Sequence, residues 1–152
     1  MTERSFGGPY VQVATICMTP LIEQQGFLSV IRMQDRIQLG GPGDQMQPQP
    51  LNALSLVIAL KAGEMRGKNT IKITPHAPSG KVLPSAETPV LFEGDERGCA
   101  IITPLAVVAE EEGLYWFDVS LEGALLTRIP LRVMYQKIHG IQGTPFQAPN
   151  TD

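Results

Sequence analysis

Residues 110–135, EEEGLYWFDVSLEGALLTRIPLRVMY, decide the fold of this chain, because they alternate in polarity on both sides of a Glu-Gly corner. The apolar members of the first half are Tyr115, Phe117, Val119 and Leu121. The residues of the second half expected on the same buried face are Leu125, Thr127, Ile129, Leu131 and Val133. Successive side chains of a strand point to opposite faces, so this period of two predicts a β-hairpin with one buried face.

The corner of this hairpin is Glu122-Gly123, and the length of the loop decides which residues face each other. A two-residue loop would place Arg128 opposite Phe117, a charge on the buried face. An odd loop, with Gly123 at positive φ in a bulge, places Phe117 and Tyr115 opposite apolar or neutral residues. We therefore expect the bulged loop rather than the tight one.

Length and charge limit the classes of protein that fit. A chain of 152 residues forms one domain, which buries roughly 70% of the surface exposed by its unfolded chain. The net charge of −3 and the scattered basic residues argue against nucleic-acid binding through phosphate neutralisation. No apolar run approaches the ~20 residues of a membrane helix, and the first residues lack the pattern of a secretory signal. We expect a cytoplasmic protein with no membrane partner.

Cysteine and histidine give no sign of a metal, cofactor or redox site. Cys17 and Cys99 lie in apolar, strand-like runs, so we expect buried, inert thiols rather than a disulfide. His76 and His139 have no Cys, Asp or Glu at ligand spacing nearby. We therefore expect no bound cofactor.

The rest of the chain is a series of β-branched and apolar runs separated by Gly and Pro. The expected strands are residues 10–18, 27–33 with 35–39 as an extension, 51–62, 69–74, 81–83, 90–92 and 99–109. Residues 51–62 also fit a helix, and we choose strand. Residues 10–137 form the predicted domain, and the segments 1–9 and 138–152 are expected to be flexible tails.

Many short strands, little helical signal and Gly/Pro turns are typical of an antiparallel sandwich or a barrel. The spacing Glu111-x-Gly113-x-Tyr115 decides between them, because it resembles the tyrosine corner of immunoglobulin-type domains, in which the hydroxyl bonds to upstream backbone. Phe117 stands where those domains often carry a cysteine. We predict an all-β, antiparallel, immunoglobulin-like sandwich of about eight or nine strands.

Three segments resemble a family of short, single-domain, uncharacterised bacterial proteins of unknown function. They are VQVATICM (residues 11–18), FLSVIRMQDRI (27–37) and GLYWFDVSLEGALLTRIPLRV (113–133). The likeness extends from about Tyr10 to Tyr135. It implies a compact β domain without a catalytic motif, and it brings no activity with it.

Two acidic runs are a candidate cation site: Glu93, Asp95 and Glu96, and Glu110 to Glu112. Loops at one end of a sandwich converge, and calcium takes about six to eight oxygen ligands. Solvated turns are the alternative, since neither run has the spacing of a dedicated calcium loop. A carbohydrate- or metal-dependent enzyme could use the same carboxylates, although no aromatic-rich groove accompanies them.

Trp116, Arg128 and Arg132 fall on the face opposite Tyr115 and Phe117. Trp and Arg dominate the energetics of protein interfaces, whereas a covering loop or packed arginine stems would explain the same residues without a partner. We hypothesise a non-enzymatic module that binds a protein partner or forms a homo-oligomer through this face. The alternatives are a structural or accessory subunit of a larger assembly, of virion or secretion type, and the enzyme considered above.

Overall fold

The computed structural model describes residues 7–138, which form strands and loops. The strands are β1 (Tyr10–Ile22), β2 (Leu28–Met33), β3 (Arg36–Gly41), β4 (Gln49–Pro50), β5 (Ser55–Lys61), β6 (Arg66–His76), β7 (Ala86–Glu93), β8 (Gly98–Pro104), β9 (Val108–Ala109), β10 (Gly113–Leu121) and β11 (Ala124–Lys137). The all-β prediction is confirmed, with more strands than expected because β4 and β9 are two-residue pieces. No helix capable of crossing a membrane occurs among residues 7–138.

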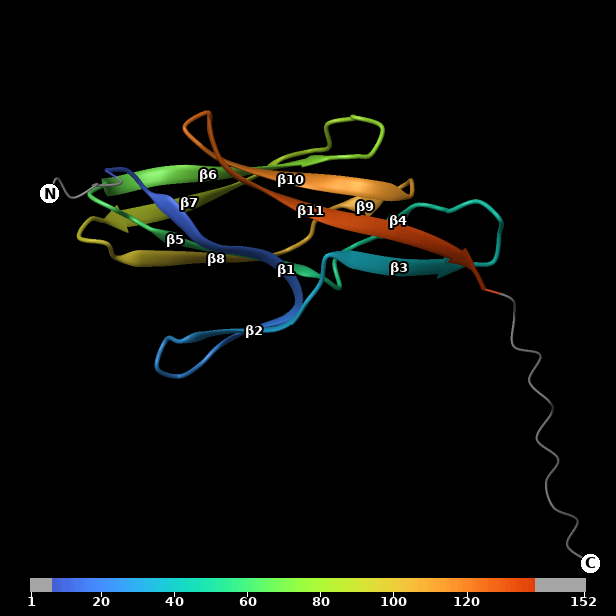
Figure 1. Cartoon of the computed structure of the whole chain (residues 1–152), viewed down its shortest axis with the longest axis horizontal. Coiled ribbons are helices and arrows are strands. Elements are labelled where there is room, and N and C mark those ends of the chain that lie inside the picture. Colours follow the sequence, from blue (N-terminus) through green and yellow to red (C-terminus); the bar gives the residue numbers. More distant parts are fainter. Residues whose placement is uncertain (1–6, 139–152) are drawn as a thin grey trace, which may run out of the picture.

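Two sheets form an immunoglobulin-like sandwich. One has the order β2-β1-β5-β8 and the other β3-β11-β10-β6-β7, and β4 pairs with β9 beside them. In Figure 1 the ribbons of β5 and β8 run below those of β6 and β10. Such a distribution of consecutive strands between two sheets is that of immunoglobulin domains. Most of the predicted tails, residues 1–6 and 139–152, lie outside the described residues.

The expectation of a purely antiparallel fold is wrong at one pair, because β3 runs parallel to β11. Residues 35–39 were expected to extend the second strand, and that prediction is also wrong. The chain turns after Met33, where the backbone N–H of Gln34 donates to the carbonyl of Ile16 at 2.8 Å. It then crosses to the other sheet, so that Ile37 pairs with Val133.

The core lies between the two sheets. The residues of β10 that face it are at most 6% exposed: Tyr115, Phe117, Val119 and Leu121. Leu56, Ile58 and Leu60 of β5 belong to the same cluster. Of the ambiguous residues 51–62, the choice of strand is confirmed for residues 55–61, whereas residues 51–54 form a turn. The alternation of residues 114–121 describes the two faces of β10 correctly.

The corner of the β10–β11 hairpin is a tight two-residue turn, which corrects the expected bulged loop. Leu121 pairs with Ala124, so that only Glu122 and Gly123 connect the strands. Both adopt left-handed backbone, with φ of 50° and 79°. Positive φ at both central residues is the signature of the type I′ turn, whose twist matches that of the strands it joins.

The bulge lies within β11 instead of in the turn. Pairing shifts from Ser120 with Leu125 to Val119 with Thr127, which leaves Leu126 as the extra residue. The tight turn places Leu125 opposite Ser120 on the outer face, so that Leu125 is 55% exposed rather than buried as predicted. The bulge then restores apolar pairing farther along, because Phe117 lies opposite Ile129 and Tyr115 opposite Leu131.

The turn offers a stabilising substitution. Glu122 has φ of 50°, a conformation that costs an ordinary L-residue about 1–2 kcal/mol and that asparagine tolerates better. We expect Glu122→Asn to raise the free energy of unfolding by about 0.5–1 kcal/mol. Chemical denaturation of the parent and the variant measures it. Glu122→Gln is the control, since it removes the charge and keeps the strain, and an equal gain in both variants would contradict the type I′ explanation.

Proline ends β8 and also lies within the edge strand β7. The predicted run 99–109 is divided into β8, which ends at Pro104, and β9. Pro89 lies in β7 and both β7 and β8 are edge strands, where a missing N–H costs no ladder bond. The predicted strand 81–83 is reduced to one bridge between Val82 and His76.

Candidate functional site

The outer face of the five-stranded sheet gathers polar side chains from its three central strands. Trp116 and Asp118 lie on β10, and β10 runs between β6 and β11. His76 of β6 lies directly opposite Trp116, and Arg128 of β11 lies directly opposite Asp118. Directly opposed residues share a face of the sheet, so these four side chains form one group, which we call the outer-face cluster.

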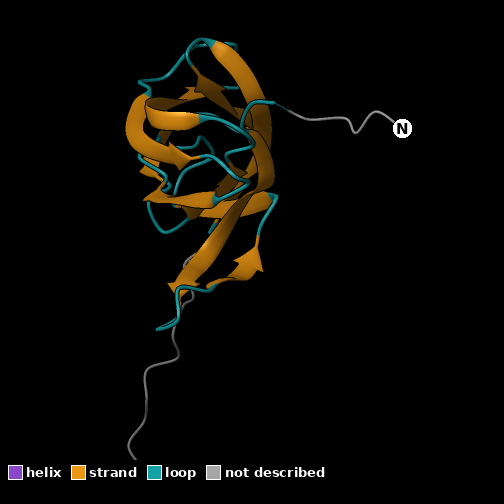
Figure 2. Cartoon of the chain, turned by 90° about the vertical axis from the view of Figure 1, so that its left-hand side faces the viewer, coloured by secondary structure: helices purple, strands orange, loops and turns teal. Residues whose placement is uncertain are grey.

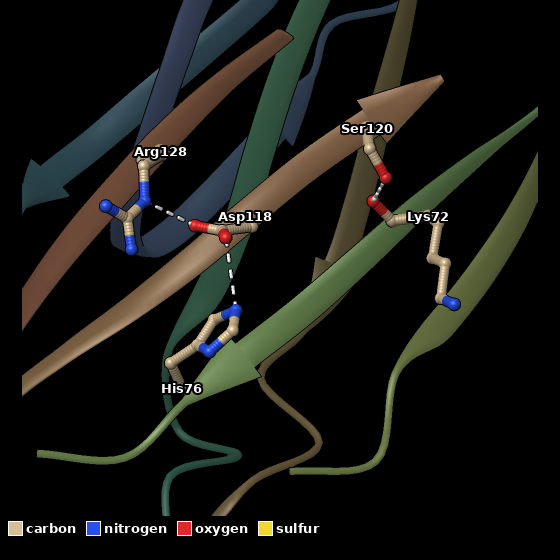
Figure 3. Close-up of polar contacts among 5 residues, drawn as sticks. All are labelled: Lys72, His76, Asp118, Ser120 and Arg128. Atoms are coloured by element: carbon tan, nitrogen blue, oxygen red, sulfur yellow. Dashed lines mark hydrogen bonds and ion pairs between the residues drawn. The ribbon is translucent and has the colours of Figure 1, made fainter. Parts of the chain in front are cut away.

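Asp118 joins the cluster across the strands. Its Oδ1 accepts a hydrogen bond from Nε of Arg128 at 2.6 Å, and its Oδ2 lies 3.1 Å from Nε2 of His76. Figure 3 shows the carboxylate between the two partners. Ion pairs that are open to solvent stabilise a protein by about 0–1 kcal/mol. Their main consequence here is therefore to hold the side chains of three strands in place.

Arg128 also covers Trp116. Its guanidinium carbon lies 4.8 Å from the centre of the indole ring, which is the geometry of a cation–π contact. Of the three guanidinium nitrogens of Arg128, only Nε has a hydrogen-bond partner among the described residues. Both Nη nitrogens point away from Asp118. The sequence analysis offered an arginine packed over Trp116 as an explanation that needs no partner, and Arg128 is packed in this way. The Nη end of its guanidinium nevertheless stays exposed.

Arg132 extends this face toward the edge of the sheet. It pairs with Leu114 on one side and with Arg36 of β3 on the other. Within residues 7–138 neither Arg36 nor Arg132 has a salt-bridge partner. The structure thus brings Trp116 and Arg128 together and leaves Arg132 as part of a cationic pair beside them.

Sequence reasoning missed the other half of the cluster. Asp118 was available from the same alternation that identified Trp116, because both occupy the outward row of one strand. His76 lies 42 positions before Asp118 in the sequence, and the pairing of β6 with β10 alone brings it there. No local pattern carries that information.

The three residues expected to form a tyrosine corner lie together at the start of β10. The Tyr115 hydroxyl donates to the carbonyl of Glu111 at 2.8 Å, and its ring is 1% exposed. Burial raises the pKa of the Tyr115 phenol above its ordinary value. Gly113 has φ of 128°, and a Cβ there would meet Pro78 at 2.8 Å. Glycine is therefore required at this entry to the strand.

The two acidic runs do not converge, so the shared calcium site considered as a candidate from the sequence is not formed by these residues. Glu93 pairs with Arg66 at the start of β6, whereas Glu111 accepts a hydrogen bond from the N–H of Ser79, beyond the end of β6, at 3.1 Å. Eleven residues of strand separate the two runs by roughly 30 Å. Nowhere between residues 7 and 138 do three or more His, Cys, Asp or Glu side chains gather as metal ligands.

Both cysteines are free thiols, and they lie on strands separated by β5. Cys17 is fully buried, whereas Cys99 is only partly buried, so the expectation of two buried thiols holds for the first. Burial raises the pKa of both thiols. A raised pKa lowers the fraction of reactive thiolate near neutral pH.

A hollow of about 720 Å³ lies beside the tyrosine corner, between residues 77–84 and 106–111. Its apolar lining includes Leu83, Val107 and Tyr115, and its charged groups are Lys81, Glu110 and Glu111. The Glu111 carboxylate already accepts the Ser79 N–H. The hollow thus offers apolar surface with one amine and two carboxylates, of which that of Glu111 is already hydrogen-bonded.

Comparison with known proteins finds likeness in structure alone. No protein-family model matches the chain, and no curated protein matches it in sequence. An immunoglobulin-like protein from Pseudomonas aeruginosa is 10% identical with a TM-score of 0.42, over 82% of this chain and 95% of that one.

Two larger enzymes each contain a region that is similar in structure to this chain. An alkylpurine DNA glycosylase from Pseudomonas fluorescens is 9% identical with a TM-score of 0.46, over 84% of this chain. A β-glucosidase from Listeria innocua is 11% identical with a TM-score of 0.40, over 86% of this chain. This chain spans 30% of the glycosylase and 17% of the glucosidase. At these identities the likeness concerns the fold and assigns no activity.

Proposed function

We propose that this chain is a non-enzymatic interaction module whose outer-face cluster binds another protein. The observation that carries the proposal is the fixed position of Arg128, which lies over Trp116 and is hydrogen-bonded by Asp118. Trp and Arg are the residues that contribute most often to binding hot spots. Here both are presented on the face of a sheet rather than buried in a core.

The geometry lowers the entropic cost of binding. Immobilising a flexible side chain at an interface costs about 0.5–1.5 kcal/mol. The guanidinium of Arg128 is already held on one side by Asp118 and supported below by the indole ring. Its Nη nitrogens can therefore donate to a partner carboxylate in the paired geometry that arginine favours.

The charges beside the cluster indicate the chemistry of the partner. Arg36 and Arg132 are paired neighbours across β3 and β11, and two neighbouring positive charges favour an acidic counterpart. We infer a partner surface that presents carboxylates to Arg128, Arg132 and Arg36. We further propose that the chain is a cytoplasmic, bacterial member of the family of short β proteins that its sequence resembles.

A cross-linking pull-down from the native host tests this proposal. We expect Trp116→Ala and Arg128→Ala to weaken capture of the partner at least tenfold, the loss of about 1.4 kcal/mol or more that hot-spot truncation produces. Arg97→Ala is the matched control, because Arg97 is an exposed arginine that also pairs with a carboxylate, that of Glu93. Capture that is equal for the parent and both cluster variants would contradict the proposal.

A further inference from the structure

Arg36 of β3 and Arg132 of β11 lie side by side on the outer face of the five-stranded sheet. The two residues are direct partners in the parallel pairing of these strands, which run next to each other in Figure 1. The next partners in the register, Ile37 and Val133, pack in the core. Because successive side chains of a strand alternate in direction, both arginines point outward, from backbones about 4.8 Å apart. We call Arg36 and Arg132 the arginine pair.

No carboxylate lies within salt-bridge distance of the arginine pair in the part of the chain that the structure describes. Asp35 precedes Arg36 in the sequence, but it contacts Arg132 through its backbone carbonyl, which accepts the Arg132 N–H at 2.9 Å. The carboxylate of Glu112 accepts the N–H of Tyr135 at 2.7 Å. Like charges on directly opposed residues of neighbouring strands repel each other. The folded chain therefore holds two positive charges together without a counter-charge.

Two neighbouring guanidinium groups suit a doubly charged anion better than a carboxylate. A carboxylate carries one negative charge, so it offsets one of the two arginines. A phosphate monoester carries a charge of about −1.5 to −2 at pH 7 and three acceptor oxygens. It therefore offsets both charges and accepts hydrogen bonds from both side chains, in the paired geometry that arginine forms with phosphate.

The surroundings of the arginine pair favour a phosphate that is attached to a macromolecule. The described chain consists of strands and loops (Figure 2), so no helix N-terminus is available to bind an anion through its backbone N–H groups. Both arginines are exposed and project from the face of a sheet. An anion carried on another surface can reach such a position as that surface docks on the sheet.

We propose that the arginine pair binds a phosphate monoester on a side chain of the protein partner. This inference rests on the proposed function, and at these two positions it replaces the partner's carboxylate by a phosphate. Arg128 retains a carboxylate as its partner, because it lies four residues from Arg132 in β11, a separation of roughly 13 Å along a strand. One phosphate cannot contact both of these residues.

Titration with three capped glycine peptides, which contain a central phosphoserine, glutamate or serine, tests the chemistry. The NMR signals of the arginine Nε–H groups report binding. The phosphoserine peptide is expected to bind at least tenfold more tightly than the glutamate peptide and to shift the signals of the arginine pair. Arg36→Gln and Arg132→Gln are each expected to weaken its binding about tenfold, since each removes hydrogen bonds between charged groups. Neither is expected to lower the melting temperature, because each removes a repulsion.

Arg66→Gln is the matched control. Arg66 is an exposed arginine of the same sheet without a salt bridge among the described residues, but its neighbour across β6 and β7 is Glu93 rather than a second arginine. This substitution is expected to leave the affinity for the phosphoserine peptide unchanged. Equal binding of the phosphoserine and glutamate peptides, or an equal loss of affinity in Arg66→Gln, would overturn the inference.

Two further probes distinguish the source of the phosphate. The phosphoserine peptide is expected to bind at least as tightly as inorganic phosphate. Vesicles that contain phosphatidic acid are expected to retain no more protein than vesicles of phosphatidylcholine alone. Tighter binding of inorganic phosphate, or retention on the phosphatidic acid vesicles, would overturn the assignment to a phosphorylated partner.

Phosphatase treatment of the native extract separates this inference from the proposed function. The treatment is expected to weaken capture of the partner in the cross-linking pull-down. Capture that depends on Trp116 and Arg128 but is unchanged by phosphatase would overturn the phosphate inference and leave the proposed function in place. Binding of the phosphoserine peptide to the arginine pair, together with capture that does not depend on Trp116 or Arg128, would contradict the proposed function alone.

Discussion

Replacing Phe117 by alanine is expected to lower the free energy of unfolding by about 3–5 kcal/mol, the cost of removing a large buried aromatic side chain and leaving a cavity. Phe117 is 1% exposed and lies between Ile129 of β11 and Pro75 of β6 in the sheet. Because stabilities of single domains are about 5–15 kcal/mol, the loss is a large part of the total. Denaturant unfolding of both proteins measures it.

Trp116 is the control for that experiment. It is the next residue of the same strand and points to the outer face, where Arg128 covers it. Trp116→Ala removes a larger side chain and is nevertheless expected to cost less than about 2 kcal/mol, since partly exposed surface and one exposed cation–π contact are lost. Equal costs at the two positions would contradict the division of β10 into a core face and an outer face.

Removing the Tyr115 hydroxyl is expected to destabilise the protein by about 1–3 kcal/mol, because the partly buried carbonyl of Glu111 that accepts its hydrogen bond loses that partner. The bond to Glu111 is 2.8 Å long and the ring is buried. Tyr115→Phe keeps the ring and removes the hydroxyl alone. Comparison of the unfolding free energies of parent and variant measures the effect.

Tyr135→Phe is the matched control for Tyr115→Phe. The Tyr135 hydroxyl also donates to a backbone carbonyl, that of Gly43 at 2.7 Å, but this bond is exposed. Water replaces the lost partner there, and we expect a cost below about 1 kcal/mol. Melting curves of Tyr115→Phe that superpose on those of the parent would contradict the structural role of the hydroxyl.

The loss of folding stability at alkaline pH is a second measure of the contribution of Tyr115. Burial raises the pKa of its phenol above the ordinary value of 10.0, so the folded state favours the neutral form. Its contribution to stability is fully present below pH 10 and is lost as the pH rises through the raised pKa. The parent is therefore expected to lose more stability above pH 10 than Tyr115→Phe does, as measured by denaturation at a series of pH values.

The alternation of residues 114–121 was sufficient to predict both faces of β10, because a period of two is a local property of a strand. The position of the bulge was not predictable in the same way. Parity required one extra residue between Phe117 and its partner, and that residue could lie in the turn or in the strand. A glutamate with positive φ is uncommon, which made a tight turn at Glu122 improbable from sequence.

Errors elsewhere arose from the path of the chain between strands. Glu93 and Glu111 were expected at one end of the sandwich, but loops share an end according to strand direction, and the pairings of β6 with β7 and β10 place them apart. The pairing of β6 with β10 also brings His76 beside Asp118, and the sequence alone does not show which strands pair. The apolar runs of β1 and β2 were predicted correctly as strands, whereas their departure from the sandwich depends on where pairing with β5 ends.

The central claim is that a protein partner contacts the outer-face cluster, and site-directed photo-crosslinking tests it most directly. A photoreactive amino acid at Pro130, which is exposed and directly opposite Trp116, is expected to form a covalent adduct with the partner in native extract. The same group at Ala100, an exposed residue of β8 in the other sheet, is expected to form none. Equal adducts from both positions, or none from position 130, would contradict the claim.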